Sequence, residues 1–171
     1  MDQIILVNNH DQEVGMMDKL EAHQKGLLHR AISVFLFNSE GKLLLQQRAK
    51  NKYHSGGLWT NTACSHPYPG ESTLQAAIRR LKEEMGLETN LTKAFQFTYR
   101  AEFTNGLIEH ELDHVYVGSS DIDPDPDREE VMDFTYLSLE EIENKLNSTP
   151  ELFTEWFKLC YKYAFHYYNQ K

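Results

Sequence analysis

Residues 65–87, SHPYPGESTLQAAIRRLKEEMGL, carry the strongest structural signal in this chain. Ser72 or Thr73 can accept from the free N–H groups at the start of a helix, and Gly86 is suited to end one in a left-handed conformation. The apolar stripe that we expect on this helix consists of Leu74, Ala77, Ile78 and Leu81. The segment therefore predicts a helix over residues 72–85 that follows a polar loop.

The polar face of this predicted helix carries two arginines and two glutamates, at Arg79, Arg80, Glu83 and Glu84. Carboxylates on one helix face can hold a hard divalent cation that bridges diphosphate oxygens. Charge pairing on a solvated helix is the commoner role of two adjacent glutamates taken alone. The preceding residues 58–71, LWTNTACSHPYPGE, add a thiol, an imidazole and several hydroxyls. Their presence favours a functional site.

Strands and further helices are predicted on both sides of this segment. Runs rich in β-branched and aromatic residues predict strands at 31–38, 42–47, 94–103, 108–117 and 133–137. Other patterns predict a short helix or turn at 16–28, an acidic loop at 121–127, a helix at 139–146 and an amphipathic stretch at 150–168. No Pro/Gly/Ser-rich linker or internal repeat divides the 171 residues, so we expect a single domain, 1–171, of the α+β class.

The chain is acidic, with a formal net charge of −9. This charge argues against a nucleic-acid backbone or an anionic membrane surface as the main partner, although a basic patch with bridging metal ions can still hold phosphates. The opening MDQIILVNN has an apolar run of only four residues, too short for a signal peptide or a membrane span. Cys64 and Cys160 indicate no disulfide framework. We therefore expect a cytoplasmic protein, and we expect it to be a monomer.

Three acids alternate along the predicted strand 108–117. Glu109, Glu111 and Asp113 share one face because side chains in a strand alternate with a period of two. Two of these carboxylates can then bind one ion, whereas decoration of an exposed sheet edge is the competing explanation. Histidines elsewhere in the chain can supply further ligands, so they favour ion binding over decoration of an exposed sheet edge.

Residues 65–87 resemble the Nudix box, G-x5-E-x7-R-E-hydrophobic-x-E-E-x-G-hydrophobic. The matching positions are Glu71, Arg79, Leu81, Glu83, Glu84, Gly86 and Leu87. Ser65 replaces the first glycine and Arg80 replaces a glutamate. The resemblance implies a Nudix-type α/β/α sandwich with a mixed sheet. The lost glutamate disfavours the water-activating chemistry of a hydrolase.

The box is altered in this same way in type 1 isopentenyl-diphosphate isomerases, and the resemblance to that family covers nearly the whole chain. It includes WTNTACSHP at 59–67, LHRA at 28–31, EHELDH at 109–114 and Trp156. It implies conversion of isopentenyl diphosphate to dimethylallyl diphosphate in isoprenoid biosynthesis, by antarafacial protonation and deprotonation through a carbocation. It also implies that the N-terminal extension, residues 1–28, contributes to the site.

Four residues match the catalytic positions of this family. Cys64 matches the catalytic thiol, although a free cysteine is often a small core residue. Glu111 matches its partner carboxylate, and Tyr99 matches a tyrosine that hydrogen-bonds to that glutamate. Trp156 matches an aromatic residue that stabilises the carbocation by a cation–π interaction of about 2 kcal/mol. Packing within a strand or helix is the competing role for the two aromatic residues.

The resemblance also implies a metal site, made of His23, His29, His66, Glu109 and Glu111. Imidazole and carboxylate together suit Mn²⁺ or Zn²⁺, and higher coordination favours manganese. His23 lies six positions before His29, and because of this spacing His10 is the alternative to His23 as a ligand. We expect the remaining histidines to be surface or hydrogen-bonded residues; these are His54, His110, His114 and His166.

The substrate is expected to be a small diphosphate held by basic residues. The candidates are Lys19, Arg48, Lys52 and Arg80, with Glu84 binding a Mg²⁺ that bridges to the phosphates. Scattered surface cations are the competing explanation for Lys19 and Lys52. Two other functions remain open at this point: a Nudix hydrolase acting on a nucleoside diphosphate derivative, and a metal-loaded binding module without turnover.

Overall fold

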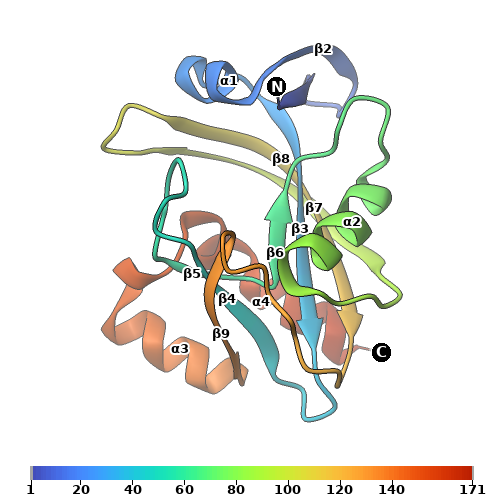
Figure 1. Ribbon diagram of the computed structural model, residues 1–171, viewed down its shortest axis with the longest axis vertical. Helices are drawn as coiled ribbons and strands as arrows, with labels where there is room; N and C mark the ends of the chain where they lie inside the picture. Colours follow the sequence, from blue (N-terminus) through green and yellow to red (C-terminus); the bar gives the residue numbers. More distant parts are fainter. Residues whose placement is uncertain (1, 171) are drawn as a thin grey trace.

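The computed structural model describes residues 2–170, which form a mixed sheet with helices on both faces (Figure 1). The strands are β1 (Gln3–Val7), β2 (Glu13–Asp18), β3 (His29–Phe37), β4 (Leu43–Arg48), β5 (Trp59–Thr60), β6 (Ala63–Ser65), β7 (Thr92–Glu102), β8 (Ile108–Ser119) and β9 (Val131–Leu137). The helices are α1 (Lys19–Lys25), α2 (Thr73–Met85), α3 (Leu139–Ser148) and α4 (Glu155–Asn169), with a 3₁₀ turn η1 (Pro150–Leu152). No helix among the described residues is long and apolar enough to span a lipid bilayer.

Strand β3 organises the sheet. It runs parallel to β8 and antiparallel to β1, β4 and β6. Every residue from Ala31 to Phe37 is buried, as expected of a strand whose two faces are both covered. β3 begins at His29 and pairs with both β8 and β6, and β6 ends at Ser65, so the sheet brings two imidazole-bearing segments to the same region as β8.

The two faces of β3 pack against different helices. Val34 lies in a cluster with Leu81 of α2, whereas Phe35 stacks on Phe157 of α4 with ring centroids 6.1 Å apart. Burial of an aliphatic or aromatic side chain of this size contributes about 1.5–3 kcal/mol to folding. Helix α2 thus covers one face and α3 and α4 the other, which confirms the predicted α/β/α layering (Figure 1).

Helix α2 ends at the predicted residue but presents a different face. Ser72 and Gln75 form a reciprocal capping box, and Gly86 ends the helix with φ 66°. The expected apolar stripe is partly wrong, because Leu74 and Ile78 are 40% and 41% exposed. The buried face consists instead of Ala76, Ala77, Leu81, Glu84 and Met85. The small side chains of the alanines let the helix pack closely on the sheet. The buried face also includes Glu84, which the sequence predicts on the polar face.

The N-terminal extension is where the sequence was least informative. β1 and β2 form a hairpin, and the helix predicted at 16–28 shrinks to α1 because 16–18 belong to β2. Asp18 caps α1 by accepting from the backbone N–H groups of Leu20 and Glu21. The short strands β5 and β6, predicted as loop, contain too few residues to show a strand pattern.

The remaining elements are close to their predicted bounds. Strands β7, β8 and β9 and helix α3, with its Ser138 cap, agree with the predicted segments to within two residues at each end. The amphipathic stretch 150–168 divides into η1 and α4, and Tyr163 on this helix is 64% exposed. Cys160 is buried in the core, as a small apolar residue would be.

Candidate active site

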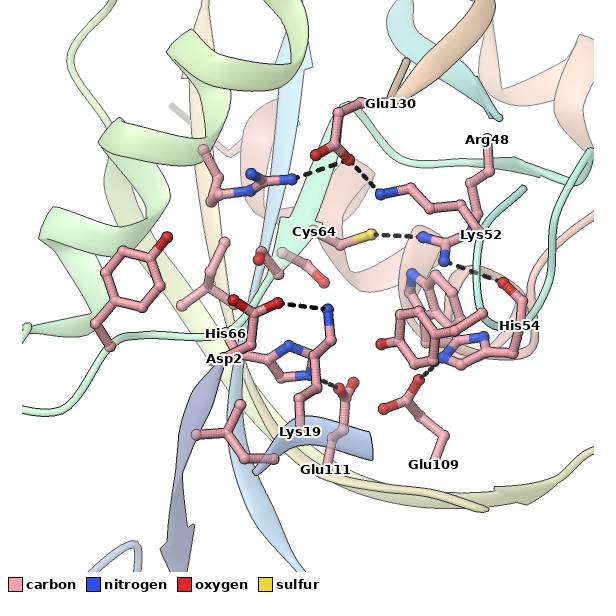
Figure 2. Close-up of a pocket in the computed structure, with 18 of the residues that line it drawn as sticks. Asp2, Lys19, Arg48, Lys52, His54, Cys64, His66, Glu109, Glu111 and Glu130 are labelled. Carbon is pink, nitrogen blue, oxygen red and sulfur yellow. Dashed lines mark hydrogen bonds and ion pairs between the residues drawn. The ribbon is translucent and has the colours of Figure 1, made fainter. Parts of the chain in front are cut away.

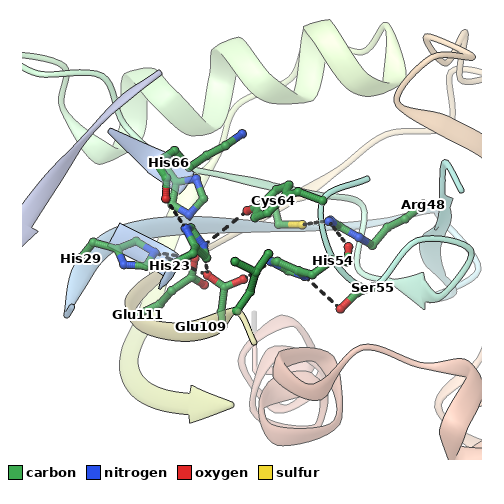
Figure 3. Close-up of polar contacts among 12 residues, drawn as sticks. His23, His29, Arg48, His54, Ser55, Cys64, His66, Glu109 and Glu111 are labelled. Atoms are coloured by element: carbon green, nitrogen blue, oxygen red, sulfur yellow. Dashed lines mark hydrogen bonds and ion pairs between the residues drawn. The ribbon is translucent and has the colours of Figure 1, made fainter. Parts of the chain in front are cut away.

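Five side chains from four parts of the chain converge at one end of the sheet (Figure 3). They are His23 of α1, His29 at the start of β3, His66 just after β6, and Glu109 and Glu111 of β8. One nitrogen or oxygen atom of each lies within 4.8 Å of the others. These are the five residues that the family resemblance implied as ligands of one metal site. His10, the alternative to His23, is exposed and outside this group.

The strand register explains this convergence. His29 on β3 lies opposite Glu111 on β8, and the alternation along β8 places Glu109 on the same face. His29 Nε2 lies 3.4 Å from Glu109 Oε1 and 3.3 Å from Glu111 Oε2. Asp113 shares this face but instead accepts a hydrogen bond from Ser33 Oγ at 2.7 Å.

The imidazoles are oriented as metal ligands usually are. Nδ1 of His23 donates to Lys19 O at 2.6 Å, and Nδ1 of His29 donates to Leu27 O at 2.9 Å. Each ring therefore directs Nε2 towards the carboxylates, and in the neutral form this atom keeps its lone pair. His23 Nε2 is 2.8 Å from Glu109 Oε1. Three imidazoles and two carboxylates in this arrangement fit a divalent metal ion.

The pKa values of His29 and His66 shift in opposite directions. Burial alone would lower the pKa of His29, but hydrogen bonds and charges from Glu109 and Glu111 outweigh it and raise the pKa to about 10. For His66 burial dominates, and the pKa falls to about 4 although Nε2 lies 2.7 Å from Glu111 Oε2. Burial and the neighbouring carboxylates therefore oppose each other at both rings, and the net shift in pKa differs in direction between His29 and His66.

Glu71 and Arg79, two residues of the Nudix-like box, hold the loop that carries His66. Arg79 donates to both carboxylate oxygens of Glu71, each at 2.8 Å, and also to His66 O at 3.3 Å. The hydrogen bonds from Arg79 lower the pKa of Glu71, so the pair stays ionised. Two box residues therefore act here by fixing a loop against α2.

A cavity lies beside the metal-ligand cluster (Figure 2). Cys64, Glu111, His66 and Trp156 all line it. Cys64 sits on β6 opposite Ser33 of β3, and its Sγ accepts from Arg48 Nη1 at 3.7 Å. Burial raises the pKa of the Cys64 thiol to about 12, against the opposing charge of Arg48.

The two predicted aromatic partners lie next to these groups. Tyr99 faces Glu111 across the β7–β8 ladder, and its hydroxyl donates to Glu111 Oε1. Burial raises the pKa of Tyr99, so it keeps its proton for that hydrogen bond. Trp156, near the start of α4, donates from Nε1 to Asn61 Oδ1 at 3.1 Å.

The four basic residues expected to hold a diphosphate all line the same cavity: Lys19, Arg48, Lys52 and Arg80. They are paired with protein groups. Lys19 Nζ lies 3.4 Å from Asp2 Oδ2, and Glu130 Oε2 contacts both Lys52 Nζ and, at 3.2 Å, Arg80 Nη2. The acidic chain therefore gathers four cationic side chains in one cavity wall, next to carboxylates that pair with three of them.

Glu84, the predicted Mg²⁺ ligand, is 2% exposed and is not among the residues that line the cavity. Its Oε1 accepts from Gln46 Nε2 at 3.0 Å, and its Oε2 lies 3.3 Å from Arg80 Nε without a hydrogen bond. Burial raises the pKa of this carboxyl.

Two residues at the site were not singled out by the sequence. His54, expected to be a surface or hydrogen-bonded histidine, is buried in the cavity wall and contacts Glu109. Glu130 was given no role. His114 is also buried, 3.1 Å from Asp11, whereas His110 is half-buried and donates to Gly26 O, and His166 is exposed. A histidine or glutamate that belongs to no motif gives no signal of its contacts.

Comparison with known proteins agrees with this architecture. The model of the NUDIX domain family matches residues 27–157. A protein of Deinococcus radiodurans has a similar structure, with a TM-score of 0.72 and 21% identity over 86% of this chain and 90% of that one. A MutT protein of Methanosarcina mazei gives a TM-score of 0.68 and 22% identity over 84% and 96%. At these identities the likeness shows the fold alone.

Curated relatives are much closer in sequence. An isopentenyl-diphosphate Delta-isomerase of Pectobacterium atrosepticum is 57% identical over 93% of this chain and 89% of its own length. An isopentenyl-diphosphate Delta-isomerase 2 of Aromatoleum aromaticum is 51% identical over 93% and 84%. With a NUDIX domain and relatives of this identity along nearly its whole length, the chain belongs to the isopentenyl-diphosphate Delta-isomerase family of NUDIX proteins.

Proposed function

We propose that this chain converts isopentenyl diphosphate to dimethylallyl diphosphate, with Cys64 and Glu111 as the proton-transferring pair. One observation carries the assignment of residues: the thiol of Cys64 and the carboxyl of Glu111 line a single cavity together with Trp156 and four basic side chains. The relatives named as isomerases support the reaction itself. In this proposal the metal site, the phosphate site and the proton-transfer groups border one cavity.

The reaction requires two proton transfers at opposite faces of a small alkene. A proton is added to the terminal alkene carbon, which leaves a positive charge at the branched carbon. Loss of a proton from the carbon on the diphosphate side then forms the new double bond. Either Cys64 or Glu111 gives the first proton and the other group takes the second. Tyr99 holds the Glu111 carboxyl in position through its hydroxyl.

Trp156 is proposed to stabilise the carbocation. Its indole N–H is bound to Asn61, and the side chain lines the cavity. A cation over an aromatic face is stabilised by about 2 kcal/mol once water is excluded. The Arg48 guanidinium already lies over this ring, with Cζ 5.3 Å from the centroid, so the ring accommodates positive charge.

Two metal ions are part of the proposal. The ion held by the five-residue cluster is Mn²⁺ or Zn²⁺, and its ligands are His23, His29, His66, Glu109 and Glu111. When bound, such an ion supplies fixed positive charge beside Glu111. Glu84 is proposed to serve Mg²⁺ bound with the diphosphate, and this role is supported by its position 3.3 Å from Arg80 Nε, one of the four basic residues that line the cavity.

The diphosphate is proposed to bind Lys19, Arg48, Lys52 and Arg80. Guanidinium groups make forked contacts with phosphate oxygens, and lysines add mobile point charges. We also propose that residues 1–171 act as one domain, that residues 1–28 complete the site through Lys19 and His23, and that the protein works as a cytoplasmic monomer.

Deuterium uptake tests this function. Purified protein, isopentenyl diphosphate, Mg²⁺ and Mn²⁺ in heavy water should yield deuterium-labelled dimethylallyl diphosphate, and Cys64→Ala should abolish the label. Cys160→Ala is the matched control, since it removes the other thiol, which lies in the core. No product from the parent protein, or release of a monophosphate from a nucleotide panel, would overturn the proposal.

A further inference from the structure

His54 lies outside the five-residue metal cluster but contacts it at one atom. Its Nε2 meets Oε2 of Glu109, whereas the other oxygen, Oε1, lies 2.8 Å from His23 Nε2 and 3.4 Å from His29 Nε2. The two oxygens of Glu109 therefore have separate partners. Oε1 faces the cluster, and Oε2 is taken by His54 (Figure 3).

The imidazole of His54 is itself held on several sides. It stacks on Phe103 with ring centroids 4.5 Å apart and an interplanar angle of 13°, and it meets Trp156 edge-on at 5.9 Å. Its Nδ1 lies 3.0 Å from Ser55 Oγ. If the Ser55 hydroxyl donates to Nδ1, the neutral ring keeps an N–H on Nε2 for Glu109. The ring has little freedom to turn away.

The loop around His54 is also tied to the proton-transfer region. Arg48 Nη2 donates to the His54 carbonyl oxygen at 3.2 Å, while Nη1 of the same guanidinium reaches Cys64 Sγ at 3.7 Å. Ser55 has φ 56°, a left-handed conformation that costs a non-glycine residue of order 1 kcal/mol or more and persists only where surrounding contacts impose it. The contacts that His54 and Arg48 make in this loop hold Ser55 in this conformation.

We propose that His54 is a positioning residue for the metal centre: it binds Glu109 Oε2 and thereby fixes Oε1 in the direction of His23 and His29. A carboxylate that can rotate presents a ligand oxygen for only part of the time, so fixing it raises the affinity of the cluster for a divalent ion. Partners that orient metal ligands in this way change metal affinity by about 10–100-fold. The inference rests on the metal site of the proposed function, but not on isomerase turnover.

Geometry distinguishes this role from direct ligation. His54 is absent from the set whose ligand atoms lie within 4.8 Å of one another, and its Nε2 contacts Oε2 of Glu109, the oxygen that neither His23 nor His29 contacts. The metal should therefore have three imidazole ligands with or without His54.

The test measures Mn²⁺ binding to metal-stripped protein by competition with a chelating indicator. His54→Ala should weaken binding by about 10–100-fold. His54→Gln, whose amide can also donate to Glu109, should recover most of the loss, and His166→Ala, an exposed histidine, should bind like the parent. Circular dichroism and the melting temperature establish that each variant is folded.

Several outcomes would overturn the inference. These are parent-like Mn²⁺ affinity in a folded His54→Ala variant, equal loss in the alanine and glutamine variants, or no Mn²⁺ binding by the parent. Pulsed electron paramagnetic resonance counts the bound nitrogens, and a decrease from three to two in His54→Ala would show a ligand instead. Turnover is measured separately in heavy water. Parent protein that binds Mn²⁺ without forming product would refute the proposed function and leave the role of His54 standing.

Discussion

Trp156 Nε1 donates a hydrogen bond to Asn61 Oδ1 at 3.1 Å, and this contact joins helix α4 to the segment between β5 and β6. Asn61 is fully buried and uses its whole amide: Nδ2 donates to Val34 O and Ala63 O, and Oδ1 also accepts from Thr60 Oγ1. The proposed carbocation-stabilising ring is thus fixed by the chain that leads directly to Cys64.

Asn61→Ala should therefore both destabilise the protein and slow turnover. The change leaves the Trp156 N–H without its acceptor and removes the hydrogen bonds from Asn61 to two backbone carbonyls, and an unsatisfied buried group costs about 1–3 kcal/mol. Urea denaturation should show a lower free energy of unfolding, and kcat should fall more than KM rises because the ring loses its orientation. Thr154→Val is the control, since it removes only the contact with Thr60. A parent-like kcat in a folded Asn61→Ala variant would contradict this account.

Glu130 is expected to compete with the substrate for its cations. One oxygen of this carboxylate contacts both Lys52 and Arg80, as an oxygen of a bound diphosphate would. Glu130→Gln keeps the shape but removes the charge, so inorganic pyrophosphate with Mg²⁺ should bind about two- to five-fold more tightly, the amount expected from loss of a partly exposed ion pair. Isothermal titration calorimetry measures this change. Glu129→Gln, next to it and exposed, is the control, and weaker binding by the Glu130 variant would contradict the prediction.

The same carboxylate should make stability depend on pH. Burial would raise the pKa of Glu130, but the hydrogen bond from Lys52 and the charge of Arg80 outweigh it, and the pKa lies below its ordinary 4.5. A folded-state pKa below the unfolded value stabilises the protein above pH 4.5, and this contribution is lost as the pH falls through the folded pKa. The difference in unfolding free energy between the parent and Glu130→Gln should therefore be largest near neutral pH and should shrink in acid. A difference that stays constant with pH would refute this.

The fold was predictable wherever a segment carried its own signal. Helix α2 has a capping serine, a terminal glycine and clear periodicity, so its bounds could be read directly. The β1–β2 hairpin could not, because exposed Val14 and Met16 blur the alternation of β2 and its pairing depends on contacts with β3. The face that α2 buries was likewise decided by the sheet, through the small side chains of Ala76 and Ala77.

The site was predictable through the resemblance and not through local pattern. The five cluster residues come from segments up to 88 positions apart, from His23 to Glu111, and only strand register brings them together. His54 and Glu130 escaped notice because they act through side chains that are distant in sequence. These are Glu109 for His54, and Lys52 and Arg80 for Glu130. Contacts of this kind follow from the three-dimensional fold.

Metal removal should lower the thermal stability of the protein. The cluster buries Glu109 and Glu111 beside three imidazoles. A divalent ion that binds only the folded state stabilises that state by RT ln(1 + [L]/Kd), which is about 2.7 kcal/mol when the ion concentration is a hundred times Kd. Mn²⁺ added to chelator-stripped protein should raise the melting temperature in a concentration-dependent way. Glu109→Gln should abolish most of that rise, because an amide is a weaker ligand than a carboxylate. Glu102→Gln, an exposed acid on β7, should keep it. An equal rise in both variants would place the stabilising ion elsewhere.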